Sequence, residues 1–182
     1  MDNEKRRLFI GTFIDRALFE SLFNDIRVGF DYVCTGKWVE LENLHFTYKF
    51  LGNVDLNKIP EILNSAGQYF TAYNSPIELK GLGAFPNPFV PKILFAKMFN
   101  PDSKIIEMQK KIDNELEKLG FEKERRRFAP HLTLRRIKSY RESFKEALAS
   151  YKELNIGIMP EFTINLIESR LSSAGPAYTI IQ

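Results

Sequence analysis

The chain contains two histidines, and each is followed two positions later by a threonine: His45 by Thr47, and His131 by Thr133. In a β-strand, side chains at positions i and i+2 point to the same face, so each histidine would stand beside its threonine. An imidazole titrates at about pH 6.5 and exchanges protons at neutral pH, and a hydroxyl group can donate a hydrogen bond to a phosphate oxygen. The spacing therefore predicts two polar pairs suited to acid–base chemistry at phosphorus.

Two such pairs facing each other would suit the cleavage of a phosphate diester. A neutral imidazole on one side of the phosphorus atom would activate water, while a protonated imidazole on the other side would give its proton to the leaving oxygen. Each transfer is worth about 10²–10⁴-fold in rate. The scheme requires no metal ion or other cofactor, and we expect none.

Simpler interpretations of the same residues remain open. A histidine on a strand is usually structural, and threonine is common in strands because its side chain is β-branched. The recurrence of one pattern at both histidines favours a functional pair over this interpretation. A zinc site is disfavoured, since the sequence has a single cysteine, Cys34, and no His-Glu-x-x-His helix. We expect Cys34 to be a buried residue without a chemical role.

Basic residues flank the second motif. Arg125 to Arg127 precede His131, and Arg135 and Arg136 follow it. A guanidinium group suits phosphate because it donates two parallel hydrogen bonds. The alternative is that these arginines form an exposed basic loop without a functional role, since runs of charged residues are usually solvated. Strict alternation along the strand places Arg135, rather than Arg136, on the face of His131.

The elements that must position these residues alternate irregularly, which indicates an α+β fold. The two motifs, at 45–48 and 131–134, each lie in a strand-like run followed by a helical pattern, so we expect one bilobal domain spanning residues 1–182 with one motif per lobe. The clearest helix is expected to begin at Pro101 and to be capped by Asn100. Strands are expected at 8–14, 37–41, 45–51, 77–85, 93–99, 131–137, 162–171 and 178–181, and helices at 18–26, 56–70, 101–119 and 140–154.

Composition restricts the class of protein. Hydrophobic residues make up 44% of the 182 residues and charged residues 27%, which is typical of a globular protein and excludes disordered and collagen-like chains. No apolar run reaches the roughly 20 residues needed to span a bilayer, and the first residues are charged where a signal peptide would be hydrophobic. With a single cysteine, these features predict a cytoplasmic protein. The net charge of +3 permits an anionic substrate without indicating an extended nucleic-acid surface.

Several segments together resemble the two-histidine phosphoesterase superfamily, and within it the RNA 2′,3′-cyclic phosphodiesterases, also called 2′-5′ RNA ligases. They are the opening RLFIGTFID, WVELENLHFTYKFLGNV at 38–54, GLGAFPNP at 81–88, RRFAPHLTLRRIK at 126–138 and the ending LIESRLSSAGPAYTII. They follow one another in the family's order and span nearly the whole chain. Two positions depart from the family's pattern: Arg127 stands where the family often has proline, and Ala129 stands where a larger or polar residue is common.

The resemblance implies a bilobal fold in which two antiparallel sheets face a central cleft, with helices packed outside. It also implies that His45 is the proton donor, that His131 is the proton acceptor, and that Thr47 and Thr133 hold the phosphate. The family's arginine, five positions after the second histidine, falls on Arg136. Alternation favours Arg135 instead, so a bulge or a strand end would be needed to bring Arg136 onto the histidine face.

The activity implied is hydrolysis of a terminal 2′,3′-cyclic phosphate on RNA, for example on tRNA fragments, to a 2′-phosphate. Reversible 2′-5′ ligation would follow the same scheme. The alternatives are a phosphoesterase of the same type acting on 2′-5′ oligonucleotides or on another cyclic phosphate, and a non-catalytic protein that binds RNA ends. We expect a monomer that does not bind membranes and needs no obligate protein partner.

Overall fold

The computed structural model describes residues 4–125, 127–172 and 175–182, and it contains two larger antiparallel sheets. The first sheet has the order β11–β10–β1–β3, with bounds Gly175–Ile180, Asn165–Ser172, Lys5–Phe13 and His45–Asp55. The second has the order β2–β7–β6–β5–β8, with bounds Cys34–Trp38, His131–Tyr140, Ile93–Phe99, Ile77–Phe85 and Asn155–Met159. A short pair, β4 (Ala72–Tyr73) and β9 (Phe162–Thr163), forms a separate two-stranded sheet next to β1.

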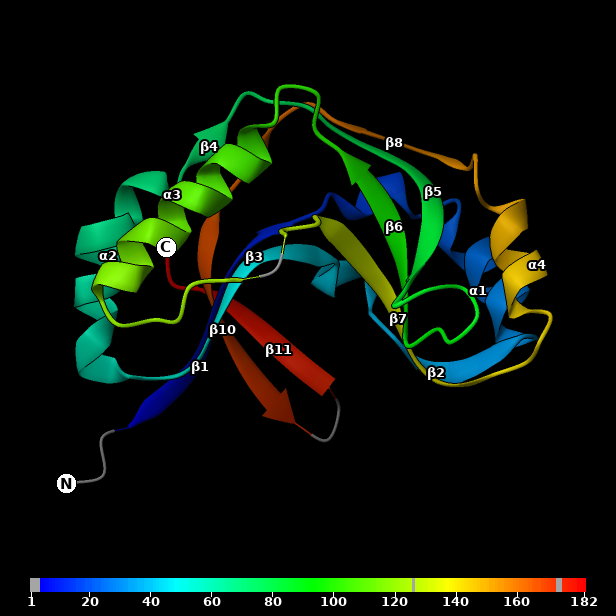
Figure 1. Cartoon of the computed structure of the whole chain (residues 1–182), viewed down its shortest axis with the longest axis horizontal. Helices are drawn as coiled ribbons and strands as arrows, with labels where there is room; N and C mark the ends of the chain where they lie inside the picture. The colour runs from blue at the N-terminus through cyan, green and yellow to red at the C-terminus, as the bar shows by residue number, and fades with distance from the viewer. Residues whose placement is uncertain (1–3, 126, 173–174) are drawn as a thin grey trace.

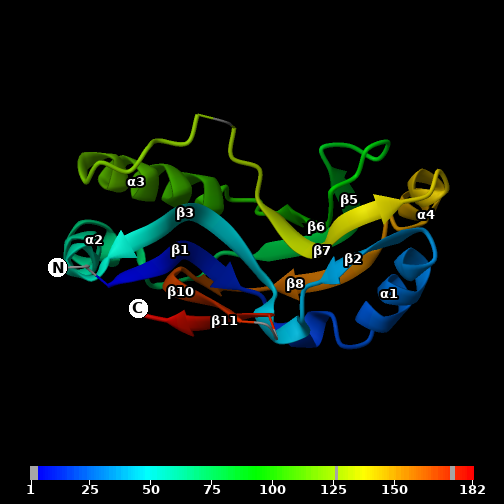
Figure 2. The ribbon, with the colours of Figure 1, turned by 90° about the horizontal axis from the view of Figure 1, so that it is seen from below.

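Among the described residues, four α-helices lie outside the sheets (Figures 1 and 2). They are α1 (Phe23–Asp31), α2 (Ile59–Ala66), α3 (Lys104–Lys118) and α4 (Phe144–Ser150). Helices α2 and α3 lie beside the first sheet, and α1 and α4 lie at the far end of the second. Short 3₁₀ turns occupy Arg16–Leu18, Leu41–Asn43, Leu56–Lys58 and Gly67–Tyr69. This arrangement confirms the expected fold class, an α+β protein with helices outside two antiparallel sheets.

The chain passes repeatedly from one sheet to the other. Strand β1 belongs to the first sheet, β2 to the second, and β3 to the first again; β5 to β8 build the second sheet before β10 and β11 return to the first. Strands β3 and β7, which carry the two motifs, lie side by side where the sheets meet (Figure 2). The crossings tie the two sheets together and hold both motifs in fixed relative positions.

Helix α3 shows how the sequence pattern produces the packing. Ile105, Met108, Ile112 and Leu116 recur at helical spacing, and all four are buried. The opposite face carries lysine and glutamate side chains that pair three and four positions apart, such as Lys111 with Glu107. The helix therefore buries one apolar stripe against the first sheet and leaves its charged face in solvent.

Some expected boundaries are wrong. Helix α3 begins at Lys104 instead of Pro101, because Ser103 adopts a left-handed conformation with φ of 57°. The N-cap is therefore Ser103 rather than Asn100, although the side-chain oxygen of Asn100 accepts a hydrogen bond from the backbone N–H of Ile105 in the first turn. The strand expected at 37–41 ends at Trp38, and the helix expected from residue 140 begins at Phe144.

The core is rich in aromatic side chains. Phe19, Phe30, Phe46, Phe144 and Phe162 are the largest of its fully buried residues. Within the described part of the chain, every helix is too short or too polar to span a bilayer.

Candidate active site

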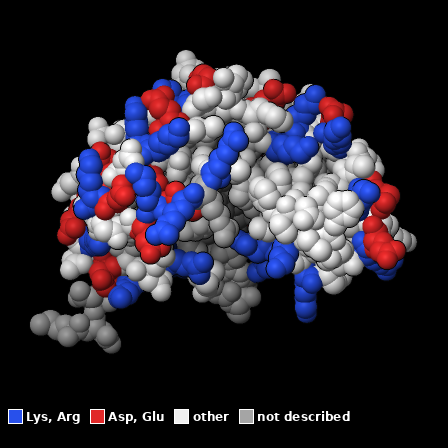
Figure 3. Space-filling model, in the orientation of Figure 1, with Lys and Arg blue, Asp and Glu red and all other residues white. Residues whose placement is uncertain are grey.

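A cleft of about 720 Å³ lies between the two sheets. Its lining includes His45 and Thr47 from β3, and His131, Thr133 and Arg136 from β7, so the two motif pairs and the arginine implied by the family resemblance meet in one cavity. The face shown in Figure 3 is hollowed near its centre, with Lys and Arg side chains around the hollow. The cleft is therefore polar at the motifs and basic around its opening.

His45 is held in one ring orientation by its surroundings. Its Nδ1 lies 2.7 Å from the backbone carbonyl oxygen of Asn43, so Nδ1 carries the hydrogen and donates to that oxygen. The ring packs against Phe9 and Tyr178, each with a centroid distance of 4.9 Å, and against Phe13 at 6.0 Å. These contacts leave Nε2 as the nitrogen available to a molecule in the cleft.

The pKa of His45 is lowered from its ordinary value. Burial is the largest cause because it penalises the charged ring, and the positive charge of Arg136 lowers the pKa further. The hydrogen bond to Asn43 acts in the opposite direction and raises the pKa. The neutral form of this imidazole is thus favoured while no anion lies near it.

His131 has the same arrangement in the second sheet. Its Nδ1 donates to the backbone carbonyl oxygen of Ala129 at 2.9 Å, again two residues before the histidine. Phe85 and Phe95 contact the ring edge to face at centroid distances of 5.0 and 5.6 Å. Each imidazole is therefore fixed by one backbone carbonyl and by aromatic neighbours. In both rings the orienting hydrogen bond is made by Nδ1, so Nε2 remains available to a molecule in the cleft.

A β-bulge decides which arginine reaches the cleft. In the pairing of β7 with β6, Thr133 lies opposite Phe95 and Arg135 lies opposite Leu94, so Leu134 is an extra residue. The extra residue reverses the alternation beyond it. Arg136 consequently lines the cleft and is exposed, and the expectation that Arg135 shares the histidine face is wrong.

Arg135 points to the opposite side of the sheet and is only 4% exposed. Its Nη1 donates to a carboxylate oxygen of Asp31 at 2.6 Å, and its guanidinium lies over the Trp38 ring at 4.6 Å. Trp38 donates from its indole nitrogen to the same Asp31 oxygen. Arg135 is thus bound within the protein, whereas Arg136 is presented to the cleft.

The first motif has the same bulge. In the pairing of β3 with β1, Thr47 lies opposite Gly11 and Lys49 lies opposite Ile10, so Tyr48 is the extra residue. Lys49 is buried, and its ammonium group binds the carboxylate of Asp113 and the carbonyl oxygen of Glu122. Residues 45–50 thus correspond one by one to residues 131–136 in geometry as well as in spacing.

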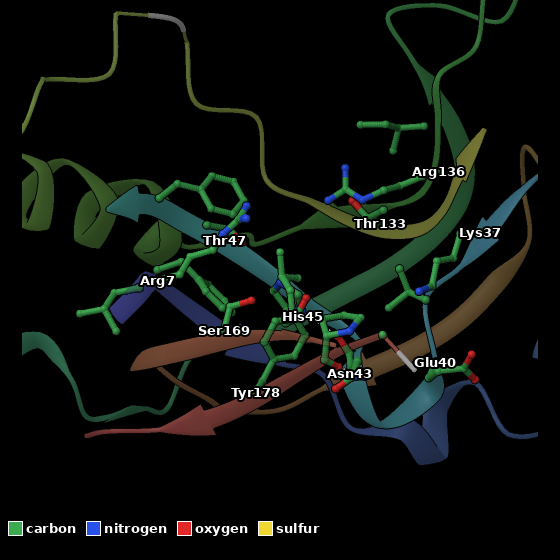
Figure 4. A pocket seen from close by; sticks show the side chains of 18 of the residues that line it. Arg7, Lys37, Glu40, Asn43, His45, Thr47, Thr133, Arg136, Ser169 and Tyr178 are labelled. Carbon is green, nitrogen blue, oxygen red and sulfur yellow. Dashed lines mark hydrogen bonds between the residues drawn. The ribbon is translucent and has the colours of Figure 1, made fainter. Parts of the chain in front are cut away.

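The two motif strands present different types of residue to the cleft at one of these corresponding positions. The counterpart of Arg136 is Phe50, which also lines the cleft and is 68% exposed. Figure 4 shows Arg7, Thr47 and Ser169 toward one end of the cleft, and Lys37 and Glu40 toward the other. Thr47 was predicted from the sequence as a site residue, but Phe50, Arg7, Ser169, Lys37 and Glu40 were not. Matching the two motifs position by position would have identified Phe50.

Other candidates lie elsewhere. Arg125 and Arg127 are exposed and do not line the cleft, and Arg126 lies outside the described residues. Cys34 is buried, its thiol donates to the carbonyl oxygen of Phe30, and burial raises its pKa. Across residues 4–125, 127–172 and 175–182, no group of three or more histidine, cysteine, aspartate or glutamate side chains could hold a metal ion.

Comparison with known proteins adds the context of a family. The sequence profile described as "LigT like Phosphoesterase" matches residues 21–95 and 99–178. The RNA 2′,3′-cyclic phosphodiesterase of Methanocaldococcus jannaschii is 38% identical over 148 residues, which cover 80% of this chain and 82% of the relative. The protein of the same name from Aquifex aeolicus is 33% identical over 180 residues, which cover 97% and 95% of the two chains.

Solved structures share the fold. Escherichia coli LigT bound to 3′-AMP matches with a TM-score of 0.75 at 20% identity, covering 98% of this chain and 97% of LigT. The ligand-free form of LigT matches with the same TM-score of 0.75 at 21% identity, covering 98% and 96% of the two chains. At these identities the likeness is one of fold.

Proposed function

The chain belongs to the LigT-like phosphoesterase family, and from that premise we propose that it is an RNA 2′,3′-cyclic phosphodiesterase in which His45 and His131 transfer the protons. It is then a hydrolase of phosphoric diesters, and its substrate is an RNA end that carries a 2′,3′-cyclic phosphate. The observation that carries the proposal is the matched pair of imidazoles in one cleft. Each ring is fixed through Nδ1 to the carbonyl two residues before it, and each leaves Nε2 for the substrate.

The proposed reaction follows from this geometry and from the roles that family resemblance assigns. Nε2 of His131 accepts a proton from water, and the water oxygen forms a bond to phosphorus. The bond from phosphorus to the ribose 3′ oxygen breaks, and that oxygen takes the proton held by Nε2 of His45. The product keeps a 2′-phosphate. If the 5′-hydroxyl group of a second RNA end takes the place of water, the same steps open the cyclic phosphate to a 2′-5′ phosphodiester, which is the proposed 2′-5′ ligase activity.

The protonation state of His45 must change when substrate binds. Burial and the charge of Arg136 favour the neutral ring in the free protein, whereas the proposed donor must carry a proton. A cyclic phosphate brings one negative charge, which offsets Arg136 and stabilises an imidazolium beside it. In the proposed scheme, binding of the cyclic phosphate therefore favours the protonated form of His45, which is the form that can act as the acid.

Thr47, Thr133 and Arg136 are the proposed phosphate ligands. The threonine hydroxyls stand on the same strands and line the same cleft as the histidines, and the guanidinium of Arg136 can donate two hydrogen bonds to non-bridging oxygens. Together they would hold the phosphate and compensate the charge that develops on it in the transition state.

We further propose that the protein acts as a cytoplasmic monomer without an obligate partner, and that residues 1–182 form one bilobal domain. The support is that one chain provides both motifs of the cleft, and that its backbone crosses repeatedly between the sheets. Light scattering would measure the molar mass and so test whether the protein is a monomer. Thermal or urea unfolding should show one cooperative transition if residues 1–182 form a single domain.

The direct test is hydrolysis of nucleoside 2′,3′-cyclic phosphates in EDTA, with the product identified by ³¹P NMR. The proposal predicts turnover without metal, a 2′-phosphate product, and a loss of about 10²–10⁴-fold in kcat for His45→Ala and for His131→Ala. A 3′-phosphate product, or full activity of either variant, would refute the assigned chemistry. Tight binding of cyclic phosphate without turnover would show a binding protein, and a panel that includes 2′-5′ oligonucleotides would reveal a different substrate.

A further inference from the structure

The backbone before His131 is irregular, unlike the backbone before His45. The carbonyl oxygen that binds His45 belongs to Asn43, which ends a 3₁₀ turn, and the next residue, Leu44, is fully buried. The carbonyl oxygen that binds His131 belongs to Ala129, which is exposed and lies in irregular backbone. A carbonyl in such backbone needs another anchor if it is to hold an imidazole in one orientation.

The segment that carries Ala129 connects α3 to β7 and passes along β3 (Figures 1 and 2). In the described part of the chain this connecting segment comprises residues 121–125 and 127–130. Its first part is bound to β3, since the ammonium group of Lys49 donates to the carbonyl oxygen of Glu122. This bond holds the start of the segment, at the opposite end from Ala129.

Phe128 holds the other end of the connecting segment. Its ring is half-buried and packs against the core. It stacks on the ring of Tyr48, with an interplanar angle of 17° and a centroid distance of 6.3 Å. Tyr48 is the extra residue of the bulge in the first motif's strand. The side chain next to Ala129, before the second motif, is thus held by a residue of the first motif.

Tyr48 is itself fixed in position. It is 4% exposed, and its hydroxyl oxygen lies 3.2 Å from that of Thr12. Thr12 donates its own hydrogen to the carbonyl oxygen of Thr163 at 2.7 Å, so the Tyr48 hydroxyl is the donor to Thr12. The Tyr48 ring also contacts that of Phe46 at a centroid distance of 5.0 Å. Phe128 therefore stacks on a ring that has little freedom to move.

The chain between Phe128 and His131 is stiff, so the position of Phe128 affects the carbonyl of Ala129. Pro130 has a fixed φ, and it restricts Ala129 to extended conformations. The direction of the Ala129 carbonyl is therefore set largely by the place where Phe128 is held. That carbonyl accepts the Nδ1 hydrogen of His131 at 2.9 Å, and so it selects the tautomer in which Nε2 is a free acceptor.

We propose that Phe128 is a positioning residue for His131, and that Tyr48 holds Phe128 in place from the first motif's strand. This inference rests on the proposed function, because it concerns the imidazole that accepts the proton from water. In the other tautomer Nε2 would already carry the hydrogen and could not accept that proton. The bulge at Tyr48 thus serves both halves of the site.

The first test measures the tautomer of His131 by ¹⁵N NMR of the untagged protein, at a pH where the ring is neutral. The chain has only two histidines, and His45→Gln assigns their signals. Phe128→Ala should increase the population of the Nε2–H tautomer of His131 by about 2- to 10-fold, because the hydrogen bond to Ala129 is lost. The His45 signals should stay unchanged, and Phe128→Tyr, which keeps the ring, should leave both histidines unchanged.

The second test measures hydrolysis of a nucleoside 2′,3′-cyclic phosphate in EDTA. Phe128→Ala should lower kcat by about 10- to 100-fold, because a small displacement of a reacting group has an effect of this size. KM should change by less than about threefold, since the proposed phosphate ligands are intact. Phe128→Tyr should keep kcat within about threefold of the value for the unaltered protein.

The stack itself is tested by changing both of its rings. Tyr48→Leu should also lower kcat and increase the Nε2–H tautomer of His131. The double variant Tyr48→Leu/Phe128→Ala should lose less in kcat than the product of the two single losses, because each substitution removes the same contact. Independent effects that multiply would show that Tyr48 does not act through Phe128.

The matched control is Phe121→Ala. Phe121 is also a half-buried phenylalanine of the connecting segment that packs against the core, but it lies at the start of the segment, where Lys58 lies over its ring. Its loss should lower stability without changing the His131 tautomer or kcat.

The inference is overturned if Phe128→Ala leaves both the His131 tautomer and kcat unchanged. It is also overturned if Phe128→Ala alters His45 and His131 equally, because that result would show a general loosening of the fold. Failure of the unaltered protein to hydrolyse the substrate would instead overturn the proposed function, and the tautomer measurement would still decide whether Phe128 orients His131.

Discussion

The neighbouring arginines of β7 allow a sharp test, because the bulge sends them to opposite sides of the sheet. Arg136→Met removes a cation that faces the cleft. A hydrogen bond to a charged group is worth about 1.5–3 kcal/mol, so kcat/KM for a nucleoside 2′,3′-cyclic phosphate should fall by about 10- to 150-fold. Because Arg136 is exposed, the free energy of unfolding should change by less than about 0.5 kcal/mol.

Arg135→Met should have the opposite outcome. It removes the contact of the guanidinium with the Trp38 ring, worth up to about 2 kcal/mol where the cation is desolvated. It also removes the ion pair with Asp31, which adds at most about 1 kcal/mol because the Asp31 side chain is 50% exposed and can be rehydrated. The free energy of unfolding should therefore fall by about 1–3 kcal/mol, and kcat/KM of the folded protein should stay within about threefold of the value for the unaltered protein.

Urea-induced unfolding followed by circular dichroism gives the stability of each variant, and initial rates in EDTA give kcat/KM. The control is Arg141→Met, which removes an exposed arginine outside the cleft and should change neither quantity. The reasoning fails if the two phenotypes are exchanged, with activity lost in Arg135→Met and stability lost in Arg136→Met. That result would mean that the strand keeps its alternation through residue 136.

Three other perturbations have definite expected outcomes. Lys49→Met should cost about 3–5 kcal/mol in urea unfolding by leaving the buried Asp113 carboxylate unpaired, whereas replacing both residues by apolar side chains should restore most of the loss. NMR titration should find the pKa of His45 below its ordinary value, and Arg136→Met should raise it. Since the folded pKa lies below the unfolded one, stability should increase with pH from that folded pKa up to about 6.5, and His45→Gln should flatten this increase. Gly36→Ala should lower both stability and activity, because φ is 149° there and a Cβ would lie 2.0 Å from the carbonyl oxygen of Arg136; normal values for both would contradict this.

The two polar pairs that line the cleft could be predicted from the sequence, because they depend on residue types and short spacings. A histidine and a threonine two positions apart share a face wherever the segment is a strand, and both motif segments are strands. The buried stripe of α3 follows equally from local periodicity. The family could be identified from the order of its motifs, without knowledge of any contact.

The position of each side chain beyond the threonines depended on the tertiary structure. Alternation holds only until a residue is inserted into a strand, and the bulges at Tyr48 and Leu134 exist because β3 and β7 must fit partner strands far away in the sequence. For the same reason strict alternation along the strands could not show that Arg135 is bound within the protein while Phe50 and Arg136 line the cleft. Which residues share a face of one strand is a local property of the backbone, whereas the pairing of strands and the cleft between the sheets are properties of the whole chain.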